Sequence, residues 1–172
     1  MKKESTRTIK YIIGIVVPLA VLYLFFHFVA GICRIPSGSM ETTIFTNDIV
    51  FINRLAYKSR KVNCGDVVVL KKDKEQLIKR VIGTSGDKIV IENGCVYRNN
   101  SVISEPYALG KTNNNGTNEY NVPKNSIFLL GDNREKSKDS RFWENPYVSN
   151  KNIVGRAYFS FGFKNGFHFK FL

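Results

Sequence analysis

The 172-residue sequence contains only two histidines and three cysteines. A Ser-His-Asp triad needs a histidine beside the nucleophile, but His27 lies in a long apolar run and His168 lies near the last residue. The cysteines, Cys33, Cys64 and Cys95, are too few for a disulfide scaffold and can form at most one internal disulfide. They are also too far apart for a Cys-x-x-Cys zinc site. The sequence therefore predicts neither a metal site nor a cofactor.

Acidic residues are scarce as well. The sequence has 14 Asp and Glu against 26 Lys and Arg, which leaves a formal net charge of +12 at pH 7. Such a charge attracts nucleic acid or anionic lipid headgroups. No RNP-like, helix-turn-helix or zinc-finger pattern occurs, so we predict no nucleic-acid partner. Membrane lipid is the simpler partner for a domain that lies beside a bilayer.

Only one apolar run is long. It extends from Tyr11 to Ile32, carries no formal charge, and is long enough to cross a hydrocarbon layer of ~30 Å as a helix. A cleaved signal peptide is the alternative, but its apolar core is usually about 7–15 residues and ends at an Ala-x-Ala-like site. Lipid attachment at the cysteine of "VAGIC" is disfavoured, because Ile32 occupies the place of a small residue. We predict an uncleaved transmembrane helix over residues 11–32.

The charges before this run indicate its orientation. Four basic residues and a single acidic residue, Glu4, precede Tyr11. Because positive flanks stay on the cytoplasmic side, we predict a cytoplasmic N-terminus over residues 1–10. Basic residues after the run reduce the asymmetry without reversing it. Residues 33–172 should then form one extracytoplasmic domain of a single-pass protein of the plasma membrane.

The region after the apolar run has the pattern of a β domain. Short segments rich in Val, Ile, Phe and Tyr alternate with Gly, Asn and Asp. Asn93-Gly94 is a favoured two-residue hairpin turn, and the polar stretch 110–123 reads as a surface loop. Together these features predict a small inserted hairpin and loop region at about 92–123. At the end of the chain, the alternating Phe167, Phe169 and Phe171 suit either a strand or an aromatic surface in the lipid interface.

Two stretches contain residues of chemical interest. "IPSGSM", residues 35–40, holds two serines directly after the apolar run, and "QLIKRVIG", residues 76–83, holds Lys79 within an apolar strand. Where no histidine is available, a lysine can deprotonate a serine if burial lowers its pKa. Taken alone, each stretch has a plainer interpretation. Strand lysines often lie at an edge or extend to water, and Ser and Gly favour any turn.

A third stretch, "GDNREKSKDSRFW" at residues 131–143, completes a pattern. In this order behind one apolar run, the three stretches resemble the type I signal peptidases, membrane-bound serine proteases that remove signal peptides from exported proteins. "DIVFINRLAY", "NCGDVVVLK" and "IKRVIGTSGD" also resemble motifs of that family, and the likeness extends to about Phe161. The resemblance implies an antiparallel β-sheet catalytic domain of signal-peptidase type. It also implies a serine endopeptidase with a Ser-Lys dyad that acts on the signal peptides of exported preproteins and cleaves after small residues at Ala-x-Ala-like sites.

The resemblance also implies roles for individual residues. Ser39, immediately before Met40, matches the nucleophile, and Lys79 of the Lys-Arg pair matches the general base. The hydroxyl of Ser37 and the backbone N–H of Ser39 match the oxyanion hole. The other matches are Ser137, which orients the lysine, and Asp139 and Arg141, which form a structural ion pair.

The substrate would add as an extended strand near residues 35–36 and 77–78, where shallow apolar pockets would admit Ala. The family commonly has Pro and then Thr-Leu after the methionine, whereas this chain has Glu41-Thr42-Thr43-Ile44. We therefore expect a less rigid turn after the nucleophile. The candidate pocket walls are Ile35, Pro36, Met40, Ile44 and Ile78.

Two other functions are compatible with parts of the sequence. A self-cleaving Ser-Lys peptidase of the repressor type would share the two reactive residues but would lack the apolar run at Tyr11–Ile32. A non-enzymatic, basic, membrane-tethered binding module would carry Ser39 and Lys79 as ordinary surface residues. A serine-reactive probe that labels Ser39, or fails to label it, distinguishes an enzyme from the last possibility.

Overall fold

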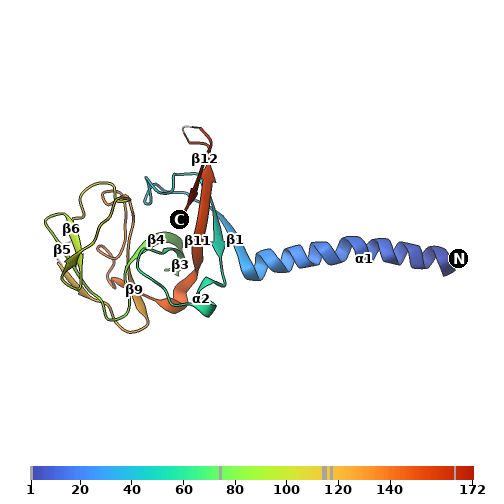
Figure 1. The fold of residues 1–172 in the computed structure, drawn as a ribbon, viewed down its shortest axis with the longest axis horizontal. Helices are drawn as coiled ribbons and strands as arrows, with labels where there is room; N and C mark the ends of the chain where they lie inside the picture. The colour runs from blue at the N-terminus through green and yellow to red at the C-terminus, as the bar shows by residue number, and fades with distance from the viewer. Residues whose placement is uncertain (1, 74, 114–115, 117, 165) are drawn as a thin grey trace.

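The structure is a computed structural model. It shows one long helix that projects from a body built of strands, with the N-terminus at the far end of the helix (Figure 1). Side chains are described from Lys10 onward. The described residues are 2–73, 75–113, 116, 118–164 and 166–172.

The helix is α1, Lys2–Leu24, and it continues into a short π-helical segment, η1, Phe25–Val29. Its portion Lys10–Val29 is long and apolar enough to cross a membrane, and none of it is buried in the protein. The helical backbone ends three residues before the predicted Ile32. There the chain becomes strand β1, Ala30–Arg34, which pairs with β2, Ile49–Asn53. The helix is therefore joined to the β body without a linker.

The main sheet confirms the predicted antiparallel β fold. Within the described residues it has eight strands in the order β1-β2-β11-β3-β4-β9-β10, with β12 paired to β11, and their pairings are all antiparallel. The apolar run of β3 is buried on both faces because it lies in the middle of this order. The other elements of this part are α2, Ala56–Ser59; β3, Val67–Lys72; β4, Glu75–Gly83; β9, Ser126–Leu130; β10, Tyr147–Ser149; the 3-10 helix η2, Asn150–Asn152; β11, Ile153–Gly162; and β12, His168–Phe171.

A second sheet of four strands has the order β7-β6-β5-β8 and contains the predicted hairpin. Asn93 and Gly94 connect paired strands and have φ angles of 52° and 81°, as a type I′ turn requires. The sheet starts at Lys88, slightly before the predicted residue 92. Part of the predicted loop 110–123 forms β8, while its residues 114, 115 and 117 lie outside the described residues. The strands are β5, Lys88–Glu92; β6, Cys95–Arg98; β7, Ser101–Val102; and β8, Glu119–Asn121.

An apolar core beneath the first strands holds the serine-containing turn. Ile35, Met40 and Ile44 lie in one buried cluster with residues of β2, β3 and β4. Complete burial of such a side chain stabilises the fold by about 1.5–3 kcal/mol. Apolar anchors thus lie on both sides of the turn at residues 36–39, and they place it against the sheet.

Candidate active site

Ser39 and Lys79 face each other in the interior. Ser39 lies in the turn after β1, Lys79 lies in β4, and Ser39 Oγ is 2.7 Å from Lys79 Nζ. The two residues are only 7% and 3% exposed. Position 79 lies where β4 pairs with β3, and β9 pairs with β4 from Arg80 onward. Lys79 is therefore buried beside β3 and does not extend to water.

Burial changes the proton affinity of this lysine. It lowers the pKa of Lys79 from 10.5 to about 8, because the charged amine loses hydration. The carboxylates of Asp139 and Asp132 partly oppose this change, since they favour the ammonium form. A substantial fraction of the lysine is consequently neutral near pH 8, and a neutral amine can accept the proton of Ser39.

The peptide group between Gly38 and Ser39 has a defined orientation. Its carbonyl oxygen accepts hydrogen bonds from Asn133 Nδ2 at 3.1 Å and from the Glu41 amide at 3.3 Å. Because a trans peptide is planar, the Ser39 N–H points away from these donors. This N–H makes no hydrogen bond to the described part of the chain. The Ser37 hydroxyl lies 3.5 Å from Ser39 Oγ, so two donors are available near the serine hydroxyl.

Two polar residues at this site, Asp132 and Asn133, were missed by the sequence interpretation. The side chain of Asn133 donates to the Gly38 carbonyl, and its backbone N–H donates to the Ser39 carbonyl at 3.1 Å. Asp132 accepts two hydrogen bonds from Arg80, at 2.8 and 2.7 Å, and one from the hydroxyl of Thr43. Residues 132 and 133 lie in the stretch 131–143, whose composition resembles any surface turn. Nothing in that composition indicates which side chains face the serine.

The same stretch approaches Ser39 very closely. A Cβ atom at Gly131 would lie 2.2 Å from Ser137 Oγ and 2.4 Å from the Ser39 carbonyl oxygen, so only glycine fits there. Ser137 is buried next to this glycine, but its hydroxyl makes no hydrogen bond within the described structure, including to Lys79. Asp139 accepts the Gly131 amide at 3.0 Å and pairs with Arg141 at 2.8 Å, with both side chains fully buried. The ion pair and this hydrogen bond connect the two ends of the segment 131–141.

A groove leads to the serine and lysine. Of the five predicted wall residues, Ile35, Pro36 and Ile78 line it, together with Ser39 and Lys79. Met40 and Ile44 do not line this groove, because they are completely buried in the core behind it. The sequence interpretation missed several further lining residues, which include Cys33, Val69 and Leu77.

Cys33, Cys64 and Cys95 are all free thiols. Within the described part of the chain, no group of three or more His, Cys, Asp or Glu side chains is placed to hold a metal ion.

A buried serine hydroxyl thus lies against a buried lysine amine, in a β domain that follows one apolar helix. The model of the family "Signal peptidase, peptidase S26" matches residues 7–162, and the chain belongs to this family. Its class of activity is that of a serine endopeptidase.

Two relatives agree with this assignment by sequence. The chain is 34% identical over 145 residues to "Probable signal peptidase I-2" of Synechocystis, an alignment that covers 78% of this chain and 64% of the relative. It is 32% identical over 179 residues to signal peptidase IB of Staphylococcus aureus, covering 94% and 91%. A crystal structure of a signal peptidase I from Enterococcus faecalis aligns with a TM-score of 0.47 and 25% identity, over 56% of this chain and 97% of that one.

Proposed function

We propose that this protein cleaves the signal peptides of exported preproteins with Ser39 as nucleophile and Lys79 as general base. The observation that carries the proposal is the 2.7 Å contact between the two buried groups. A buried pair of this kind disfavours the binding-module alternative, in which both side chains would be on the surface. The helix α1 and the family match disfavour the self-cleaving repressor type.

The reaction would proceed in two steps. Neutral Lys79 takes the proton of the Ser39 hydroxyl while Oγ bonds to the scissile carbonyl carbon. The negative charge that develops on the carbonyl oxygen would be stabilised by the Ser39 N–H and the Ser37 hydroxyl. When the C–N bond breaks, the departing amine receives the proton from the Lys79 ammonium. A water molecule, deprotonated by Lys79, then attacks the acyl carbon, and the ester bond to Oγ breaks as the Lys79 ammonium returns the proton to Ser39.

Free backbone edges support an extended substrate. β1 is the last strand of its sheet, and β4 pairs with β9 only from Arg80 onward, so residues 76–78 have an open side. These segments border the groove that ends at Ser39. A peptide that adds between them would alternate its side chains, so the first and third residues before the cut would face the same wall. With Ile35 and Ile78 in that wall, small residues such as Ala would fit.

Purified, detergent-solubilised protein tests the proposal directly. Incubation with a preprotein should produce a new N-terminus immediately after an Ala-x-Ala-like site, as read by N-terminal sequencing. Changing the first or third residue before the cut from Ala to Phe should prevent cleavage, whereas the same change at the second residue is the matched control. Absence of cleavage, or cleavage that ignores the first and third residues, would contradict the proposal.

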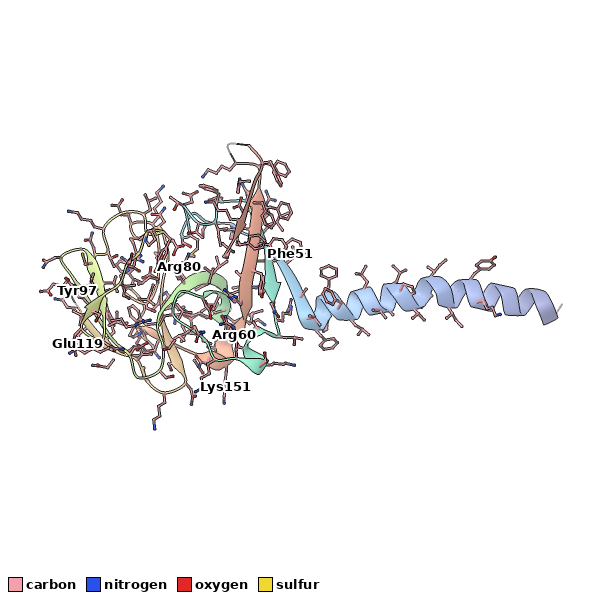
Figure 2. The ribbon with its side chains drawn as sticks, in the orientation of Figure 1. Phe51, Arg60, Arg80, Tyr97, Glu119 and Lys151 are labelled. Carbon is pink, nitrogen blue, oxygen red and sulfur yellow. The ribbon has the colours of Figure 1, made fainter. Side chains whose placement is uncertain are left out.

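The end of the chain forms both a strand and an aromatic surface. β12 pairs with β11, and its Phe169 and Phe171 are 46% and 79% exposed. Phe169 packs on Phe159, which stacks on Phe51 with ring centroids 4.4 Å apart. Phe51 lies on the side of the β body from which the helix projects (Figure 2). We propose that this aromatic surface rests in the lipid interface, where aromatic side chains are favoured.

This surface is continuous with the membrane helix. Phe25 and Phe26, at the end of the helix, line an apolar cavity together with Phe51, Tyr158 and Phe159 of the sheet. The basic residues that precede Tyr11 further lead us to propose a cytoplasmic N-terminus at the plasma membrane. The catalytic domain would then lie outside the cell, beside the point where a signal peptide leaves the bilayer.

One labelling experiment tests both the orientation and the aromatic surface. In a variant lacking the three native cysteines, Val102→Cys on the second sheet should react with a membrane-impermeant thiol reagent added to intact wall-less cells. Phe171→Cys should react only after detergent is added, because lipid covers it. Labelling of Val102→Cys only after lysis would reverse the orientation. Equal labelling of both positions in intact cells would place the aromatic surface in water.

A further inference from the structure

Residues near the end of the sequence contact the loop that follows the nucleophile, although the family model ends at residue 162. We call residues 163–172 the tail. Strand β12 of the tail folds back on β11 and pairs Phe159 with Phe171 and Gly162 with His168. The tail thereby reaches the loop 41–48, which follows Met40. This contact is not accounted for by the reaction proposed above.

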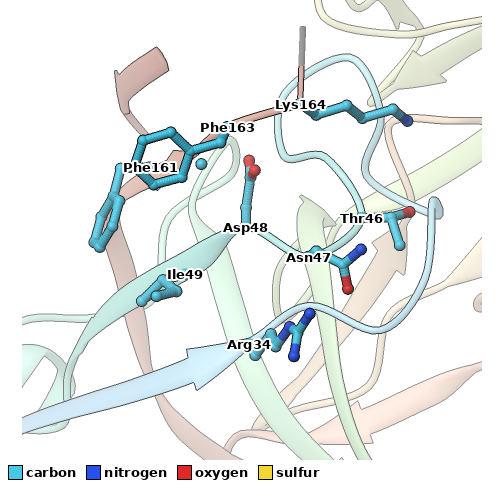
Figure 3. A pocket seen from close by; sticks show the side chains of 9 residues that line it. Arg34, Thr46, Asn47, Asp48, Ile49, Phe161, Phe163 and Lys164 are labelled. Atoms are coloured by element: carbon cyan, nitrogen blue, oxygen red, sulfur yellow. The ribbon is translucent and has the colours of Figure 1, made fainter. Parts of the chain in front are cut away.

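Three polar side chains of the tail bind this loop. Lys164 Nζ lies 2.6 Å from the Glu41 carboxylate, and Lys170 Nζ donates to the Thr42 carbonyl at 2.6 Å. His168 Nε2 lies 2.9 Å from Asp48, whose carboxylate is buried. The ammonium groups of Lys164 and Lys170 also lie 5.3 and 5.2 Å from the ring centre of Phe45. Figure 3 shows the cavity where the segments meet, with Lys164 from the tail and Thr46, Asn47 and Asp48 from the loop.

These contacts are connected to the oxyanion donor. The carboxylate of Glu41 pairs with Lys164. The backbone N–H of Glu41 donates to the Gly38 carbonyl at 3.3 Å. That carbonyl belongs to the same planar peptide as the Ser39 N–H, so movement of Glu41 reorients the N–H. Asn133 Nδ2 donates to the same carbonyl at 3.1 Å. Both the tail, through Glu41, and the stretch 131–143 therefore constrain this one peptide.

The loop lacks the residue that commonly makes it rigid in this family. Position 42 is Thr where Pro is common, and a proline would fix φ near −65°. The Thr42 amide makes no hydrogen bond to the described part of the chain, so a proline there would cost no backbone bond. A single exposed ion pair contributes little, but the charge-assisted bond from Lys170 holds the Thr42 carbonyl itself.

We propose that Lys164 and Lys170 are positioning residues that hold the loop 41–48 and thereby orient the Ser39 N–H, in place of a proline at position 42. This inference rests on the proposed peptidase function. Loss of an oxyanion donor lowers turnover by about 10²–10³. Loosening the loop displaces the donor without removing it, so a smaller effect on kcat is expected, with KM unchanged.

Steady-state kinetics on the full chain test this role. Lys170→Met should lower kcat about tenfold, which is less than the decrease caused by losing an oxyanion donor. KM should change less than twofold. Lys151→Met, at an exposed lysine of η2, is the matched control and should leave both constants unchanged. Adding Thr42→Pro to Lys170→Met should restore kcat to within about threefold of the native enzyme, because the ring restricts the same bond rotations. An unchanged kcat in Lys170→Met, or no rescue by Thr42→Pro, would overturn the inference.

Hydrogen exchange provides a readout that needs no activity. In Lys170→Met and, independently, in Lys164→Met, peptides covering residues 40–48 should exchange faster than in the native protein, while peptides of β3 and β9 keep their native rates. Unchanged exchange at 40–48 in both variants would also overturn the inference. Native protein that fails to cleave any preprotein contradicts the proposed function instead, and the exchange measurement still decides whether the tail holds the loop.

Discussion

Ser39→Ala is expected to abolish preprotein cleavage while the protein remains folded. The variant removes the hydroxyl oxygen that lies 2.7 Å from Lys79 Nζ, and loss of a serine nucleophile lowers kcat by about 10⁶ where it has been measured in other proteases. The lost hydroxyl leaves a very small space, and the core residues Met40 and Ile44 still hold the turn. The measurement is the cleavage rate, with thermal unfolding as the check on folding.

Ser37→Ala is the matched comparison for this variant. Ser37 lies 3.5 Å from Ser39 Oγ and is exposed, so its loss should remove one oxyanion donor and lower kcat by about 10²–10³. Activity should therefore be weak in Ser37→Ala and undetectable in Ser39→Ala. Native activity in Ser39→Ala would eliminate the proposed nucleophile. The reverse order of effects would assign that role to Ser37.

Lys79→Arg is expected to be inactive although it retains the positive charge. A guanidinium remains protonated at any workable pH, so it cannot accept the proton of Ser39. The cleavage rate is the measurement, and Lys71→Arg on an exposed position of β3 provides the control for a Lys-to-Arg change. A folded, membrane-inserted Lys79→Arg protein that still cleaves at the normal site would exclude Lys79 as the general base.

The pH profile of the native enzyme should report the same group. Burial lowers the pKa of Lys79 to about 8, so the lysine is mostly charged below that value and mostly neutral above it. Because only the neutral amine can act as the base, kcat/KM should rise as the pH increases through about 8 and then level off. A profile that falls across this range would indicate that the charged form is the active one.

Neighbouring residues make the environment of Lys79 more complex than the sequence indicates. Alternation along a strand predicts that Arg80 and Lys79 point to opposite faces. The Arg80 guanidinium donates two hydrogen bonds to Asp132. It also lies over the ring of Tyr107, 3.9 Å from the ring centre. Asp132 in turn accepts a hydrogen bond from Thr43, and its charge opposes the lowering of the Lys79 pKa by burial. Arg80 thus ties β4 to the loop after the nucleophile.

Local sequence features determined the elements of this fold. The uncharged run forms helix α1, the Val- and Ile-rich segments form antiparallel strands, and Asn93-Gly94 makes the predicted hairpin turn. Each of these features depends only on residues close together in the sequence. Helices and strands follow from the spacing of apolar residues, and the hairpin turn follows from two residues that accept positive φ angles. The end of the helix depended on pairing instead, because Ala30–Arg34 became strand β1 when it met β2.

The active-site chemistry was only partly visible in the sequence. The residue types and their order singled out Ser39 and Lys79, since a serine without a histidine partner needs another base. The two residues are 40 positions apart, and their meeting at 2.7 Å required the chain between them to fold into β2, β3 and β4. The low pKa of Lys79 required burial. Proximity and burial are properties of the packed structure, so a linear pattern indicates them only by resemblance.

Contacts between distant segments were decided by the tertiary structure alone. Asn133 binds Gly38 across 95 positions, and Lys170 binds Thr42 across 128. Asparagine and lysine in polar stretches carry no signal for such partners, because their usual place is the surface and water is their usual partner. Met40 and Ile44 were identified as apolar, but only packing decided that they fill the core and leave the groove wall to Ile35, Pro36 and Ile78. Composition and periodicity thus determined which elements form and which groups can react, and the packing of those elements decided which groups meet.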